Sequence, residues 1–128
     1  MKGIPCVSTP KGGVRMPVII SNLVKQYVEL LCKIYGEHLK TVILYGSYAR
    51  GDYTEDSDID IMVLLDLDEM EIKKYRHELS GMTYDFNMDY DLDIKPIAKN
   101  KEHFYKWAGV YPFYFNVENE GVTLFEAA

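Results

Sequence analysis

Cysteine is scarce in this chain, and long apolar runs are missing. The 128 residues include two cysteines, Cys6 and Cys32, which form no CxxC pair and are too few for a disulfide framework. We therefore expect the reducing cytoplasm as the location. No apolar run approaches the roughly 20 residues that a membrane span needs. The N-terminal residues carry lysine and arginine but lack the continuous apolar segment of a signal peptide, so no membrane insertion is expected.

Positive charge is also in short supply. The chain has 14 Lys and Arg against 20 Asp and Glu, which gives a net charge of −6. Proteins that coat nucleic acids neutralise phosphates with a basic face, so this balance argues against bulk nucleic-acid binding. A nucleotide site is not excluded, because a divalent metal held by surplus carboxylates would supply the missing positive charge.

The length of the chain suits one domain with one core. Residues 1–17 contain several glycines and prolines and no apolar periodicity, and we expect a flexible leader there. Residues 18–128 are expected to form the domain itself.

Apolar periodicity predicts the first elements of this domain. Helical spacing covers Val18–Tyr35, and Gly36 is the expected stop. Two short runs of β-branched, aliphatic and aromatic residues, Thr41–Tyr45 and Ile59–Leu65, are typical of buried strands.

The second half of the chain is less uniform. A polar helix is predicted at Asp66–Ser80, with Asp68 as its N-cap. Apolar and mostly acidic side chains alternate through Tyr84–Ile97, which predicts a strand with one buried and one acidic face. Two short aromatic-rich helices and a closing strand are expected at Lys99–Ala108, Tyr111–Glu118 and Val122–Phe125. This order predicts an α/β (α+β) fold, a small mixed β-sheet flanked by helices.

The residues suited to chemistry lie between the first two predicted strands, in the segment YGSYARGDYTEDSDID. Gly46 lets the backbone turn sharply and lets a phosphate come close. Ser47 begins a turn or short helix whose N–H groups and hydroxyl can hold triphosphate oxygens. Asp58 and Asp60 stand two residues apart on a strand, so they point to the same side and could share magnesium ions with substrate phosphates.

Some neighbouring residues leave alternatives open. Arg50 could reach a phosphate, or it could pair with Asp52 or Glu55 on the surface. The spacing of Asp58 and Asp60 after Asp56 imitates the first half of a calcium loop, but an apolar strand follows where that loop needs a glycine. The three histidines lack metal-ligand spacing and are expected at the surface.

The pattern of Gly46 and Ser47, then ten residues, then Asp58 and Asp60, resembles the nucleotidyltransferases of the DNA polymerase beta superfamily. The string GSYARGDYTEDSDIDIMVLL is similar to the minimal nucleotidyltransferases of bacteria and archaea, and the resemblance extends over about Ile34–Phe125. It implies a nucleotidyltransferase fold in which the glycine and serine contact the triphosphate. It also implies that the two aspartates bind Mg²⁺, with two ions expected.

The resemblance also implies a third carboxylate from a later strand, which here is the predicted strand Tyr84–Ile97. Asp91 and Asp93 fall on the same predicted face, and either could serve. We favour Asp93 and keep Asp91 as the alternate. Asp58, Asp60 and Asp93 are therefore the expected catalytic metal ligands, and Gly46, Ser47 and Arg50 the expected nucleotide-binding residues.

The function implied by the resemblance is Mg²⁺-dependent transfer of a nucleoside monophosphate, AMP from ATP or another nucleoside triphosphate, to a hydroxyl acceptor. Proteins of this kind are commonly paired with HEPN-type proteins in toxin–antitoxin modules. This chain lacks the arginine–histidine motif of the toxin, so it would be the antitoxin. One alternative is a non-catalytic nucleotide-binding or toxin-neutralising module. Another is an antibiotic nucleotidyltransferase, which usually carries an additional helical domain.

Overall fold

A computed structural model describes residues 17–127 of the chain. The predicted leader, apart from Pro17, lies outside the described residues. Four strands form one sheet: β1 (Leu39–Tyr45), β2 (Ile59–Leu65), β3 (Ile94–Asn100) and β4 (Val122–Glu126). Their order is β3-β2-β1-β4, with β1 antiparallel to β2 and β4, and β2 parallel to β3. The predicted mixed sheet is confirmed.

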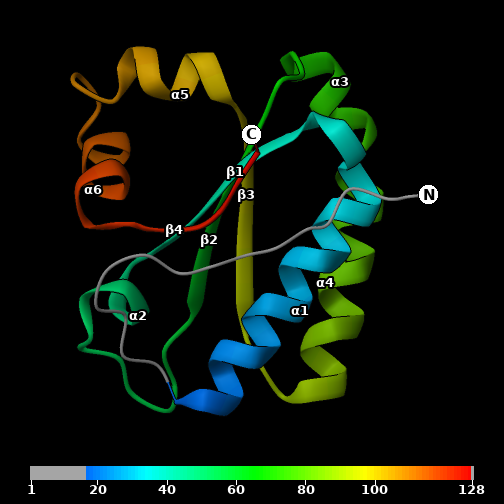
Figure 1. Ribbon diagram of the computed structural model, residues 1–128, viewed down its shortest axis with the longest axis vertical. Helices are drawn as coiled ribbons and strands as arrows, with labels where there is room; N and C mark the ends of the chain where they lie inside the picture. The colour runs from blue at the N-terminus through cyan, green and yellow to red at the C-terminus, as the bar shows by residue number, and fades with distance from the viewer. Residues whose placement is uncertain (1–16, 128) are drawn as a thin grey trace.

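Helices cover both faces of this sheet (Figure 1). One face packs against α1 (Val18–Tyr35) and α4 (Arg76–Tyr90), and the other packs against α5 (Lys101–Trp107) and α6 (Pro112–Glu120). The shorter helices α2 (Ser47–Arg50) and α3 (Glu69–Lys74) follow β1 and β2, and a 3₁₀ turn (Gly36–His38) joins α1 to β1. The fold is therefore a three-layer α/β arrangement with the sheet in the middle.

The two central strands, β1 and β2, are buried on both faces. Val42 and Leu44 belong to the core beneath α1 and α4, whereas Ile43 belongs to the core beneath α5 and α6. This double burial explains why both strands are uninterrupted apolar runs in the sequence. On the first face the Tyr27 hydroxyl lies 2.7 Å from Thr83 Oγ1, which ties α1 to α4.

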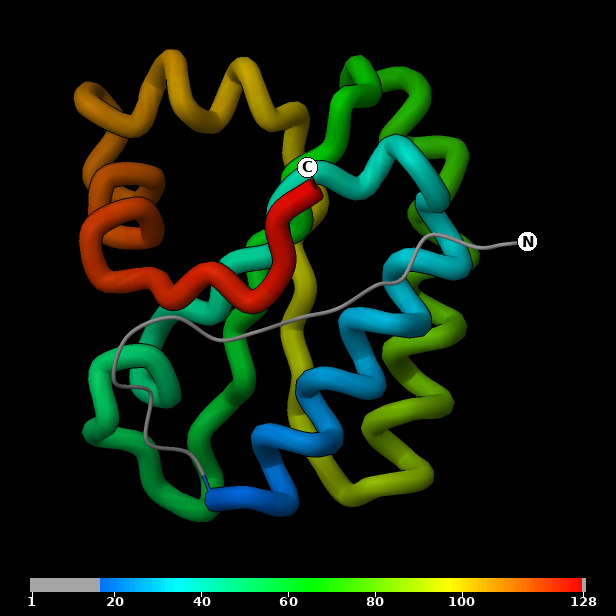
Figure 2. Tube along the Cα trace, in the orientation of Figure 1, coloured from blue at the N-terminus to red at the C-terminus, as the bar shows by residue number. Residues whose placement is uncertain are grey.

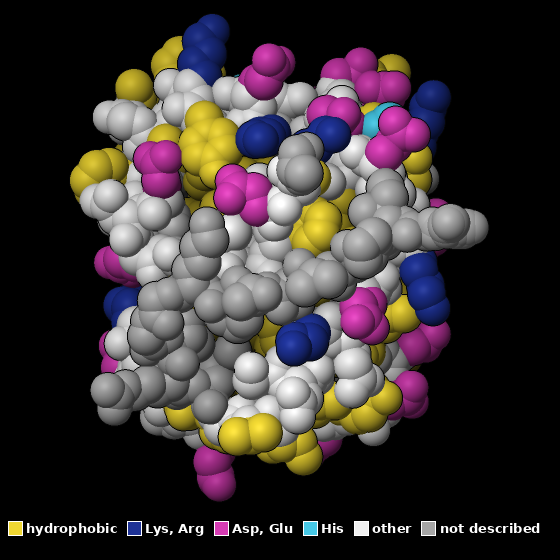
Figure 3. All heavy atoms as spheres, in the orientation of Figure 1, with side chains coloured by type: hydrophobic (Ala, Val, Ile, Leu, Met, Phe, Trp, Pro, Cys, Tyr) yellow, Lys and Arg dark blue, Asp and Glu magenta, His cyan; other side chains and the backbone are white. Residues whose placement is uncertain are grey.

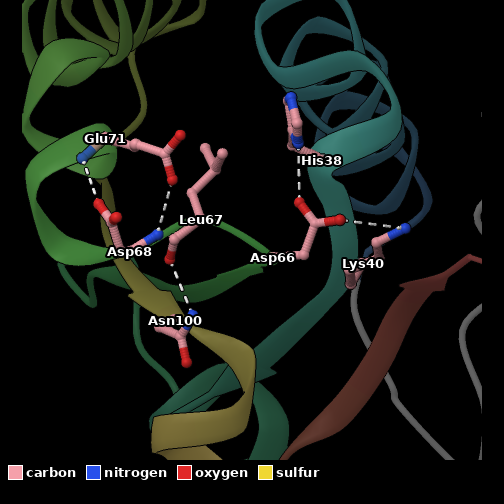
Figure 4. A network of polar contacts seen from close by, with 7 residues as sticks. All are labelled: His38, Lys40, Asp66, Leu67, Asp68, Glu71 and Asn100. Carbon is pink, nitrogen blue, oxygen red and sulfur yellow. Dashed lines mark hydrogen bonds and ion pairs between the residues drawn. The ribbon is translucent and has the colours of Figure 1, made fainter.

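Polar contacts hold the end of β2 that lies away from the predicted site (Figure 4). Asp66 Oδ1 lies 2.8 Å from His38 Nδ1. The predicted N-cap is confirmed, because Asp68 accepts from the Glu71 N–H at 2.8 Å and the Glu71 side chain accepts from the Asp68 N–H at 3.1 Å. Asn100, the N-cap of α5, donates from Nδ2 to the Leu67 carbonyl at 2.8 Å. These contacts bind β1, β2, α3 and the end of β3 together.

The predicted strand at Tyr84–Ile97 is wrong. Residues up to Tyr90 belong to α4, and the strand begins only at Ile94. The alternation of apolar and polar residues does not match the observed burial, because Tyr84 and Met88, which were assigned to the buried face, are 65% and 67% exposed. The buried side chains of α4 instead recur at helical spacing: Leu79, Thr83 and Phe86. The predicted helix Asp66–Ser80 is likewise two helices, α3 and α4, that meet at Tyr75.

Several large apolar side chains remain exposed on α6 and on the turn between α5 and α6. Val110, Tyr111, Phe113 and Phe115 are 45–62% exposed, whereas Phe104 and Tyr114 are buried against the sheet. Figure 3 shows hydrophobic side chains gathered at its upper left, over α5 and α6. Within residues 17–127 no helix is both long and apolar enough to cross a membrane.

Candidate active site

Gly46 forms the turn between β1 and α2. Its φ of 78° lies in the left-handed region, which L side chains disfavour. A Cβ at this position would also collide with a carboxylate oxygen of Asp60. Ser47, the first residue of α2, follows at once. The turn predicted to hold a triphosphate therefore lies against one of the predicted metal ligands.

Asp58 and Asp93 meet because β2 and β3 run parallel and begin in register. Ile59 pairs with Ile94, and the Ile59 N–H donates to the Asp93 carbonyl at 2.9 Å. Asp58 and Asp93 each directly precede these paired residues, and their side chains share a hydrogen bond. Asp60 follows in β2, opposite Tyr45 of β1. The three predicted metal ligands therefore lie at the same end of neighbouring strands.

Asp91, which was predicted to lie on a strand, lies outside β3. It caps the C-terminus of α4 with a φ of 55°, in the turn before β3. This conformation is tolerated by aspartate better than by most residues. The structure thus brings Asp93 rather than Asp91 to the side of Asp58.

The three carboxylates perturb one another. The hydrogen bond from Asp93 and the contact with Lys95 lower the pKa of Asp58, while the same hydrogen bond raises the pKa of Asp93. Partial burial, followed by the charge of Asp58, raises the pKa of Asp60. Burial and the charge of Asp60 also raise the pKa of Tyr45 to about 12, so this phenol stays neutral beside the acidic group. Hydrogen bonding sets the directions for Asp58 and Asp93, and burial sets those for Asp60 and Tyr45.

The donor set suits a hard divalent cation, because every donor is a carboxylate oxygen. The side chains as they stand are not closed around an ion: among the described residues no group of three His, Cys, Asp or Glu is placed to hold a metal. Asp58 Oδ2 instead lies 3.1 Å from Lys95 Nζ. Asp58, Asp60 and Asp93 are the carboxylates that could supply Mg²⁺ ligands at this end of the sheet.

Lys95 is the site residue that the sequence interpretation missed. It stands two residues after Asp93, and the two-residue period of a strand places it on the same side. It also pairs with Asp60 in the β2–β3 register. The predicted strand Tyr84–Ile97 already put Lys95 on the face of Asp91 and Asp93, so this spacing alone could have found it.

Arg50 lies at the end of α2, with half-exposed ion pairs on both sides. Its guanidinium lies 3.3 Å from Asp52 Oδ2 and 3.4 Å from Glu120 Oε1 of α6. Of the two expected surface partners, Asp52 is present and Glu55 is replaced by Glu120. Such exposed pairs contribute little to stability. The positive charge of Arg50 also acts on Asp60, where it opposes the rise in pKa.

A cavity of about 700 Å³ opens beside Asp93. It lies between the start of α1, the loop from α2 to β2, and the turn from α4 to β3, which come together at the lower end of Figure 2. Its carboxylates come from Glu55, Asp56, Asp91 and Asp93. No Lys, Arg or His is among the described residues that line it. The parallel rings of Tyr48 and Tyr53, with centroids 4.4 Å apart, form part of its wall.

Comparison with known proteins identifies the family. The sequence model of the nucleotidyltransferase domain matches residues 24–116. Two proteins of Methanocaldococcus jannaschii, each described as a candidate protein adenylyltransferase, are similar to this chain. One is 35% identical over 105 residues, covering 82% of this chain and 98% of the relative, and the other is 36% identical over 102 residues, covering 80% and 94%.

A solved structure is also similar: a candidate nucleotidyltransferase from Sulfolobus solfataricus has a TM-score of 0.42 and 23% identity, covering 74% of this chain and 85% of the other. The family assignment depends on the match to the family's sequence model and on the two relatives from M. jannaschii. The protein described here therefore belongs to the nucleotidyltransferase domain family and is a transferase of nucleotidyl groups.

Proposed function

We propose that this protein is a cytoplasmic, Mg²⁺-dependent adenylyltransferase that moves AMP from ATP to a hydroxyl group of another protein. The observation that carries this proposal is the approach of Asp58, Asp60 and Asp93 at one end of β2 and β3, beside the Gly46 turn. The descriptions of the two M. jannaschii relatives as candidate protein adenylyltransferases support adenine as the base and a protein as the acceptor.

In the proposed reaction the acceptor oxygen forms a bond to the α-phosphorus, and the bond from that phosphorus to the leaving pyrophosphate breaks. Bound Mg²⁺, with two ions expected, would polarise the α-phosphate and stabilise the pyrophosphate. Asp58, Asp60 and Asp93 would hold the metal, and a carboxylate oxygen of Asp93 would accept the proton of the acceptor hydroxyl. Gly46, Ser47 and Arg50 would bind the triphosphate.

The cavity beside Asp93 is the proposed entry for the acceptor. It adjoins the proposed base, whereas Gly46 and Ser47 are absent from its lining. Its four carboxylates would repel a triphosphate but not a hydroxyl-bearing segment of a protein. Nucleotide and acceptor would therefore approach Asp93 from different sides.

The test is transfer of label from ATP labelled at the α-phosphate, with Mg²⁺, to the product of the adjacent gene. We expect adenylylation of that protein and release of pyrophosphate by the native chain. Both should be lost in Asp58→Asn and Asp60→Asn, which keep the side-chain shapes. Persistent transfer in either variant would contradict the assignment of these carboxylates as metal ligands.

The resemblance to minimal nucleotidyltransferases supports a further part of the proposal, that the acceptor is a HEPN-type toxin and this chain its antitoxin. Co-expression tests it. The native chain should relieve toxicity of the adjacent gene product, and Asp58→Asn should not. Relief by both forms would instead favour a non-catalytic module that neutralises by binding.

A further inference from the structure

Lys95 is a cation placed among three carboxylates. Its Nζ lies 3.1 Å from Asp58 Oδ2, and it faces Asp60 across the β2–β3 ladder. The contact with Asp58, followed by the charges of Asp93 and Asp60, raises the pKa of Lys95. Its side chain is 57% exposed, so its position depends on the ion pair rather than on packing.

A metal ion and the Lys95 ammonium group compete for the negative charge of Asp58. The Asp58 oxygen that contacts Lys95 belongs to a residue proposed to bind Mg²⁺. Two cations within about 4 Å of each other also repel. Metal binding at Asp58 therefore weakens the ion pair and favours movement of the ammonium group away from Asp58.

The displaced ammonium group needs a new partner. Lysine has a flexible four-carbon stem and a compact charge that suits phosphate oxygens. When the metal enters together with a nucleoside triphosphate, the phosphates can accept the ammonium group. When the metal enters alone, the ion pair between Lys95 and Asp58 is weakened and the ammonium group gains no new partner. The two ligands should consequently bind better together than separately.

We propose that Lys95 couples metal binding to nucleotide binding, holding Asp58 while the nucleotide is absent and passing to the phosphates when the metal–nucleotide complex enters. Lys95 is thus a positioning residue that acts through Asp58. This inference rests on the proposed function of the site. By linkage, the factor by which nucleotide strengthens metal binding equals the factor by which metal strengthens nucleotide binding.

The test measures Mn²⁺ affinity of the full chain by electron paramagnetic resonance, with and without a non-hydrolysable ATP analogue. Without nucleotide, Lys95→Met should bind Mn²⁺ about tenfold more tightly than the native chain, because a competing charge is removed. With the analogue this advantage should disappear. Lys95→Arg, which keeps the charge, should behave like the native chain. The control is Lys99→Met on the same strand, where the paired residue is the apolar Leu64, and no change is expected.

Equal or weaker Mn²⁺ binding by Lys95→Met without nucleotide would overturn the inference, and Lys95→Gln provides a second neutral variant should the first fail to fold. A native chain that binds Mn²⁺ and analogue with coupling unchanged by Lys95→Met would overturn this inference alone. A native chain that binds no Mn²⁺ even with the analogue would overturn the proposed function as well.

Discussion

Gly46 is constrained both by its backbone conformation and by its contact with the candidate active site. Its positive φ and its contact with Asp60 leave no room for a side chain. Gly46→Ala should therefore lower the free energy of unfolding by about 1–3 kcal/mol. It should also weaken nucleotide binding, because Asp60 must move. Chemical denaturation and titration with an ATP analogue measure the two effects.

Gly81 supplies the matched control. It lies within α4, and a Cβ there would meet no atom within 4 Å. Gly81→Ala should raise the free energy of unfolding by about 0.5–1 kcal/mol, since alanine loses less conformational freedom in a helix. If both glycine variants behave alike, the special role assigned to residue 46 is wrong.

The choice between Asp93 and Asp91 is also decided at the residue scale. Asp93 contacts Asp58, whereas Asp91 caps α4. We expect Asp93→Asn to lower kcat about a thousandfold, the range for loss of a general base. Asp91→Asn keeps a residue that tolerates the positive φ and should retain most of the rate with an uncharged acceptor. Single-turnover label transfer compares them, and the reverse ranking would restore Asp91 as the third ligand.

At the scale of elements, the junction between α4 and β3 sets the position of Asp93. The Asn87 side chain accepts from the Ile94 N–H at 2.9 Å and donates to the Ile94 carbonyl at 3.2 Å. Asn87→Ala removes both bonds at a partly buried position and should cost about 1–3 kcal/mol of unfolding free energy. Because Ile94 directly follows Asp93, the rate should fall more than nucleotide affinity does. Thermal unfolding and kcat against KM measure these effects.

Short-range sequence patterns predict some elements correctly and fail at the junction between α4 and β3. β2 and the Asp68 cap follow from short-range patterns, an apolar run and a capping box, and both are predicted correctly. The region Tyr84–Ile97 fails because its strict alternation is a local pattern, whereas α4 is stabilised by packing on α1, as in the contact of Phe86 with Tyr27.

Topology could not have corrected that error. β2 and β3 run parallel, and parallel neighbours need a crossover of about a dozen residues or more, usually a helix. A strand beginning at Tyr84 would still leave residues 66–83 for such a crossover after β2. The wrong strand start placed Asp91 and Asp93 on one face of a strand, although the motif from Gly46 to Asp60 was already in place.

At the scale of the whole molecule, charge decides which acceptors can approach. The net charge is −6, and the cavity beside Asp93 is lined by four carboxylates. A negative surface of this kind attracts basic segments and repels acidic ones. At 0.1 M salt both effects are largely screened beyond about 10 Å. The acceptor hydroxyl should therefore lie between lysine or arginine residues.

Peptides with one tyrosine flanked by lysines or by glutamates test this expectation. The native chain should modify the lysine-flanked peptide about tenfold more efficiently, and the preference should shrink as salt is raised. Replacing Glu55 and Asp56 by lysine should reverse the ratio, because both line the cavity from the loop before β2. The ratio is internal to each protein, so a loss of overall activity does not imitate it. If charge reversal instead changes the affinity for ATP and leaves the peptide ratio intact, the cavity serves the nucleotide, and the acceptor must enter from another side of Asp93.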